Sequence, residues 1–103
     1  MISYLRELIS LFNNTEWVSK QRMLDTKLAE HTPSCPDEIT NYLLYLREHG
    51  RQQRERIANI SSIFDYRDTV RAINQENNMI LAELEEAFNT MSPCAHIQTL
   101  YKK

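Results

Sequence analysis

The C-terminal half of the chain carries a regular apolar pattern that predicts a long amphipathic helical region. From residue 63 to residue 91, apolar side chains recur mostly at steps of three and four residues, which is the spacing of one helix face. The pattern is interrupted once, because Asn77 occupies a position where this alternation requires an apolar side chain. From residue 70 onwards, the apolar members of this C-terminal seam are Val70, Ile73, Ile80, Leu84, Ala87 and Met91.

Asn77 has two explanations that the sequence leaves open. In a parallel, in-register coiled coil, the Asn side chains of two copies can meet, which fixes register and oligomer state at a cost in stability. Alternatively, Asn77 lies at a solvated edge of a helical bundle, and the neighbouring amide of Asn78 fits a plain polar surface. The first explanation requires a partner helix, and the second does not.

A second apolar seam, here called the central seam, precedes the first. Gly50 within it can end a helix as a C-cap, but residues 51–56 contain no turn residue and resume the same phase, so we expect a continuous or kinked helix. The phase slips at Ser61-Ser62, which indicates a coiled-coil discontinuity or a new helix start, since Ser62 and Asp65 resemble a capping box. The apolar members of the central seam are Ile39, Leu43, Leu46, Ile57, Ile60 and Phe64.

Shorter helices are predicted nearer the N-terminus, and prolines separate the units. Thr15 can start a helix that runs to about residue 30, preceded by a helical stripe over residues 2–12, although one unbroken helix over both is the alternative. Pro33 and Pro36 break the chain, and Pro36 suits the first position of a new helix. The expected units are N-terminal amphipathic helices over 1–31, a long helical or coiled-coil region over 36–92, with a kink allowed near 50 or 61–62, and a tail over 93–103 in which Ile97, Leu100 and Tyr101 can dock.

The composition agrees with an all-α fold. One Gly and three Pro among 103 residues predict few turns, which argues against a sheet protein. We therefore expect a small helical bundle or hairpin with a long C-terminal helical, coiled-coil region. A single helix over residues 36–91 would be roughly 84 Å long at about 1.5 Å per residue, so it would need helices folded back along it, a partner chain, or both.

The net charge, the lack of a long apolar run and the N-terminal residues suggest a soluble intracellular protein without a membrane segment. The formal net charge is −2, and no apolar run approaches the roughly 20 residues of a membrane-spanning helix. The N-terminal residues do not resemble a signal peptide. Two cysteines without secretion are expected to be free thiols in a reducing compartment. The sequons at Asn13 and Asn59 would then be accidental, since glycosylation needs secretion.

Two sets of residues could carry other chemistry. His31, Cys35, Cys94 and His96 have ligand types that suit zinc, but their spacing is unfamiliar, and a Cys35–Cys94 disulfide is a further alternative to free thiols. No nucleophile–base pair, paired-carboxylate motif or Gly-rich phosphate loop is visible, so we expect no cofactor, no metal and no enzymatic activity.

An arginine-rich stretch supports the alternative function. Arg47, Arg51 and Arg54 share one helix face and could contact phosphates, which would suit a small helical nucleic-acid-binding protein. Nearby carboxylates and the absence of interleaved aromatic residues favour a solvated charged face instead. The acidic stretch over residues 74–91 could also pair with the arginine-rich stretch of a second copy.

One segment resembles a known family. Residues 70–77, Val-Arg-Ala-Ile-Asn-Gln-Glu-Asn, and the later Leu84-Glu85-Glu86 resemble a coiled-coil stretch of the suppressor-of-IKK-epsilon family. Members of that family are helical scaffold subunits in kinase–phosphatase signalling assemblies. The resemblance covers only this segment and carries over no functional residue.

These patterns predict a non-catalytic helical subunit that mediates the assembly of a protein complex through amphipathic coiled-coil helices. The partner is another protein or a second copy of the chain, and neither membrane nor nucleic acid is the favoured partner. The residues expected to bind it are Val70, Ile73, Asn77, Ile80, Leu84, Ala87 and Met91 in the C-terminal seam, and Leu43, Leu46, Ile57 and Ile60 in the central seam.

Overall fold

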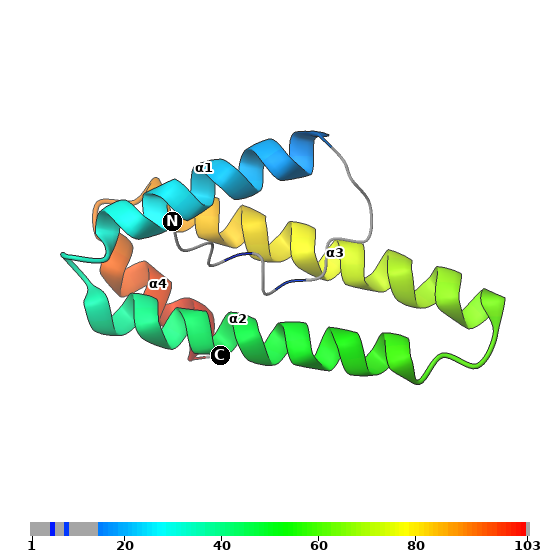
Figure 1. Ribbon diagram of the computed structural model, residues 1–103. Helices are drawn as coiled ribbons and strands as arrows, with labels where there is room; N and C mark the ends of the chain where they lie inside the picture. The colour runs from blue at the N-terminus through cyan, green and yellow to red at the C-terminus, as the bar shows by residue number, and fades with distance from the viewer. Residues whose placement is uncertain (1–4, 6–7, 9–14, 103) are drawn as a thin grey trace.

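A computed structural model describes residues 5, 8 and 15–102, and this part of the chain contains helices and no strands. The all-helical class predicted from sequence is confirmed. Figure 1 shows α2 and α3 as a long antiparallel hairpin, with α1 and α4 packed at the end away from the α2–α3 turn. We call the α2–α3 turn the distal end of the hairpin. The helices are α1 (Thr15–His31), α2 (Pro36–Ala58), α3 (Ile63–Phe88) and α4 (Pro93–Tyr101).

Helix α2 starts and continues as its sequence predicts. Pro36 occupies the first turn, where its missing N–H is not needed, and Asp37 and Glu38 place negative charge at the positive helix start. The helix runs through Gly50, which is buried and has a negative φ, so Gly50 is not a C-cap. The expected continuity of this helix is confirmed.

The slip in phase at residues 61–62 marks a new helix. Helix α2 ends at Ala58, and the Asn59 N–H donates to the carbonyls of Glu55 and Ile57. Ser62 is the N-cap of α3, and its side chain accepts a 3.1 Å hydrogen bond from the Asp65 N–H. A single helix over residues 36–91 therefore does not form, because the chain turns back on itself here.

Loss of this cap should weaken the hairpin measurably. Ser62→Ala removes the oxygen that accepts from the Asp65 N–H, so the free energy of unfolding should fall by about 1 kcal/mol in urea titrations. Ser62→Asp keeps an acceptor at the same position and should retain most of the stability. Equal losses in both variants would show that the cap contributes nothing.

The main core lies where all four helices meet, at the end of the hairpin away from the distal turn. Tyr42 lies deep within it, and burial raises the pKa of its hydroxyl far above the usual range, reinforced by Tyr45 and Glu83. This cluster of buried residues combines Leu5, Leu8, Leu24, Leu28, Cys35, Ile39, Tyr42, Leu46, Ile80, Leu81, Leu84, Ala87, Ile97 and Leu100. Side chains of this size each contribute on the order of 1.5–3 kcal/mol when fully buried.

Helix α1 begins at Thr15, as the sequence predicts, and buries Leu24 and Leu28. Most of the predicted helix over residues 2–12 lies outside the described residues. Leu5 and Leu8 are described and buried, and the Leu5 N–H donates a 3.0 Å hydrogen bond to Oδ1 of the buried Asp25. The buried carboxylate of Asp25 thus holds Leu5 against α1.

The predicted tail is helical over most of its length. Helix α3 ends at Phe88 rather than at the Ser92-Pro93 break, and α4 then starts with Pro93 in its first turn. Ile97 and Leu100 are buried against α2 and α3, so the tail docks on the core. Within the part of the chain that is described, no helix has the length and apolar content needed to cross a membrane.

Candidate interaction surface

Most residues that the sequence assigned to a partner interface lie inside the chain's own core. Helices α1, α2 and α4 cover the inward face of α3, so the C-terminal seam contacts helices of the same molecule. Of the predicted residues, Met91 is fully exposed, and Leu43, Ile57 and Ile60 are half-buried. The buried ones are Leu46, Val70, Ile73, Asn77, Ile80, Leu84 and Ala87. Little surface of the C-terminal seam is therefore exposed for a second molecule to bind.

Asn77 follows neither explanation offered by the sequence. Its side chain is 1% exposed, so it is not at a solvated edge. Its Oδ1 accepts a 2.6 Å hydrogen bond from Nε2 of Gln53, which is also 1% exposed. Gln53 lies between Leu46 and Ile57, at a position where the spacing of the central seam would place an apolar side chain. The polar residue that interrupts the central seam therefore meets the one that interrupts the C-terminal seam, inside the hairpin. The amide is satisfied within the chain, and self-pairing with a second copy is not needed.

The arginines on the face of α2 that could contact phosphates are engaged within the chain. Arg51 donates to Glu48 at 2.6 Å and to Glu55 at 2.9 Å, and the hydrogen bond from Arg51 to Glu48 holds the pKa of Glu48 below its usual range. Arg47 and Arg54 also have interactions within the chain. This face offers a phosphate backbone less unpaired charge than its sequence suggests.

The complementary charges of α2 and α3 meet across the hairpin. Arg56 donates to Glu76 at 2.7 Å, joining the arginine-rich stretch to the acidic one. Lys20 of α1 forms a second pair, with Glu85, at 3.1 Å. Both pairs are partly exposed and each is worth at most about 1 kcal/mol. The sequence suggested that the arginine-rich and acidic stretches of two copies could pair. Arg56 and Glu76 instead pair within one chain.

The two cysteines form a disulfide, which corrects the expectation of free thiols. Cys35 precedes α2, and Cys94 lies in the first turn of α4, with a Cα–Cα distance of 5.6 Å. The helix starts come together because α4 packs back onto α2. The bond joins positions 59 residues apart and fixes α4 to the core. The intracellular expectation rested on an N-terminus that does not resemble a signal peptide, and the disulfide does not fit the reducing compartment that was expected with it.

The alternative zinc ligands do not assemble. Both sulfur atoms are bonded to each other, and His31 Nδ1 lies 2.8 Å from the Lys27 carbonyl oxygen while its ring contacts that of Phe88. Across residues 15–102 with Leu5 and Leu8, no group of three or more His, Cys, Asp or Glu side chains could hold a metal ion. His31, Cys35 and Cys94 instead make contacts within the chain at the ends of helices.

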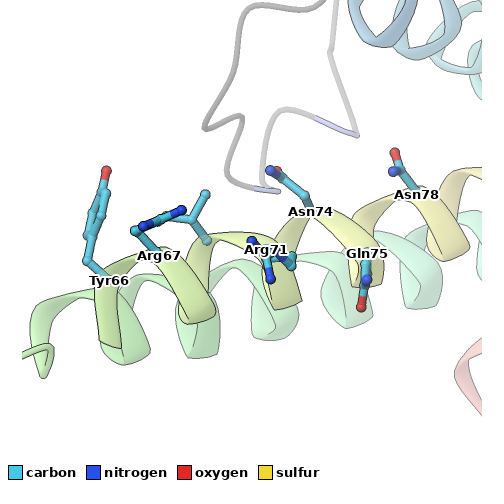
Figure 2. A pocket seen from close by; sticks show the side chains of 7 residues that line it. Tyr66, Arg67, Arg71, Asn74, Gln75 and Asn78 are labelled. Atoms are coloured by element: carbon cyan, nitrogen blue, oxygen red, sulfur yellow. The ribbon is translucent and has the colours of Figure 1, made fainter. Parts of the chain in front are cut away.

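A groove along α3 has a volume of about 340 Å³. Figure 2 shows Tyr66, Arg67, Asn74 and Asn78 projecting from this side of the helix. The residues that line the groove are Tyr66, Arg67, Val70, Arg71, Asn74, Gln75 and Asn78. Amide groups and guanidinium groups thus surround the little apolar surface that Val70 and the Tyr66 ring supply.

Arg67 and Arg71 distinguish this groove from the face of α2. Both are exposed, and neither forms an ion pair or hydrogen bond within the described part of the chain. Two unpaired guanidinium groups one helical turn apart favour negative charge in a ligand or partner. Asp65 and Asp68 stand near both arginines in the sequence, but neither forms an ion pair with them among the described residues.

The distal end of the hairpin exposes large apolar side chains. Ile63 and Phe64 in the first turn of α3 are 71% and 72% exposed, and Tyr66 is 47% exposed. Phe64 was expected to belong to the central seam, but the turn at residues 59–62 moves it out of that seam. These side chains form an apolar surface next to the α2–α3 turn.

No family model, curated protein or solved structure matches this chain. The resemblance of residues 70–86 to a scaffold family therefore has no family match to support it. What the surface does must be inferred from its own chemistry.

Proposed function

We propose that the protein is a non-catalytic interaction subunit that binds an acidic amphipathic helix of another protein in the groove along α3. The observation that carries this proposal is the groove with two unpaired arginines, Arg67 and Arg71, on either side of Val70. An amphipathic helix docks by placing an apolar side chain in a groove and polar groups at its rim. Acidic residues of the partner would then meet the two guanidinium groups.

The groove also offers hydrogen bonds that can set the register of a bound helix. Asn74, Gln75 and Asn78 each present both an amide donor and an amide acceptor. An extended acidic partner without an apolar anchor would use the arginines alone. We therefore expect the partner to combine at least one Leu- or Met-sized anchor with carboxylates about one turn apart.

The test measures binding of a labelled helical peptide with Leu and Glu on one face. Reversing both charges with Arg67→Glu and Arg71→Glu should weaken binding at least tenfold, which is about 1.4 kcal/mol. Fluorescence anisotropy titrations at fixed salt give the dissociation constants. The same double variant should also lose the protein partner that co-purifies with the native chain after nuclease treatment.

A matched control separates the groove from net charge. Arg22 and Lys102 are exposed and lie outside the groove, so Arg22→Glu with Lys102→Glu changes the net charge equally. This control should leave binding within twofold. Equal weakening by both double variants would mean that only overall charge matters, and unchanged binding in the groove variant would exclude the groove.

A further inference from the structure

Both cysteines of the chain are used in one disulfide. The sequence contains two Cys, and they are the pair Cys35 and Cys94. Disulfides that hold a small fold together form and persist in oxidising compartments, such as the secretory pathway. The Asn-X-Ser/Thr sequons were treated as accidental because the N-terminal residues do not resemble a signal peptide, but the disulfide points to an oxidising compartment, so these sites need to be considered again.

The sequon Asn59-Ile60-Ser61 lies where a glycan can be carried. It forms the turn at the distal end of the hairpin, between the last residue of α2 and the N-cap of α3. Asn59 and Ser61 are exposed, and the middle residue is not proline. Only the backbone N–H of Asn59 is engaged, and its side-chain amide forms no hydrogen bond in the described part of the chain.

A glycan at this turn would also account for the apolar surface beside it. Ile63 and Phe64 lie two and three residues after the end of the sequon at Ser61, and both are more than two-thirds exposed. Exposed apolar side chains of this size promote association unless something covers them. A bulky hydrophilic glycan on Asn59 would shield them and keep the hairpin end in solution.

We propose that Asn59 is an N-linked glycosylation site, modified in an oxidising secretory compartment. Nδ2 of Asn59 forms a bond to the anomeric carbon of an oligosaccharide carried on a polyprenyl diphosphate. The bond from that carbon to the diphosphate oxygen breaks, the lipid diphosphate leaves with the electron pair, and the amide nitrogen gives up one proton. The second sequon, at Asn13, lies outside the described residues and forms no part of this proposal.

The test maps the peptide that contains Asn59 in the chain purified from its native cells. Trypsin cleaves after Arg56 and Arg67, so the sequon lies in the peptide 57–67, and Asn13 falls in a different peptide. Treatment with peptide N-glycosidase in heavy-oxygen water should convert most of this peptide to a form with labelled Asp at position 59. The untreated sample should lack the free Asn59 peptide to the same extent.

Variants of the full chain, expressed through a secretory route, identify the acceptor. Asn59→Gln and Ser61→Ala should abolish the glycan on this peptide, whereas Ser61→Thr should retain it. Ser62→Ala is the matched control, because it changes the neighbouring serine outside the sequon and should retain the glycan. Unmodified Asn59 in native chain that contains the Cys35–Cys94 disulfide would overturn the proposal, as would a native chain whose cysteines are both reduced.

Discussion

Replacing Cys35 and Cys94 by alanine together is expected to lower the free energy of unfolding by about 4 kcal/mol. The bond joins residues 59 positions apart, so it removes much of the conformational freedom of the unfolded chain. Reduction should have nearly the same effect as the double replacement. Because α4 is short and is fixed by this bond at its first turn, its docking through Ile97 and Leu100 should weaken most.

The measurement is urea unfolding followed by far-ultraviolet circular dichroism, with and without a thiol reductant. The native protein should shift to a lower midpoint on reduction, whereas the double-alanine variant should not respond to the reductant. Neither cysteine should react with a thiol reagent before reduction. Rapid labelling of both thiols in the untreated protein, or an unchanged midpoint on reduction, would contradict the disulfide.

Local chemistry in the sequence predicted where α1 and α2 begin. The first position of α2 followed from Pro36 and the two carboxylates after it, because a missing N–H and negative charge both suit a helix start. The continuity of α2 through Gly50 followed from the unbroken phase on its two sides. The cap at Ser62 was visible as a motif, although the sequence left open whether it began a helix or marked a coiled-coil discontinuity.

What covers an apolar seam could not be predicted in the same way. The spacing of apolar residues identifies which helix face is buried. It does not show whether a partner chain or another helix of the same chain covers that face. The turn at residues 59–62 decides the matter, because it returns α3 along α2 and lets α1 and α4 cover the rest. Without that turn, Ile80 and Leu84 would have required a second molecule.

The sequence also could not predict which residues far apart in the chain come into contact. Cys35 and Cys94 are 59 positions apart, and their approach depends on how α4 packs against α2. The groove on α3 was missed for a similar reason. Arg67 and Arg71 stand near carboxylates in the sequence, but only the arrangement of side chains in space shows that they remain unpaired. One signal was available, since both lie on the same helix face as Asn74 and Asn78.

The buried hydrogen bond between Gln53 and Asn77 leads to a prediction about the free energy of unfolding. Asn77→Leu should lower the free energy of unfolding by about 1–3 kcal/mol, because it removes the oxygen that accepts from Gln53 Nε2 while Gln53 stays buried. Changing both residues to leucine should recover most or all of that loss, since an apolar pair needs no hydrogen bond in the same space. The molar mass in solution should stay the same throughout, because the pair lies within one chain.

Urea titrations of the two single variants and the double variant give the coupling between these positions directly. Asn78→Leu is the matched control, since Asn78 is the exposed neighbour and its replacement should change stability by no more than about 0.5 kcal/mol. Additive losses in the double variant would show that the two amides act independently. A rise in stability and mixed oligomeric states for Asn77→Leu alone would instead restore the self-paired coiled coil, because only there does removal of the Asn relieve a buried polar group and a register constraint together.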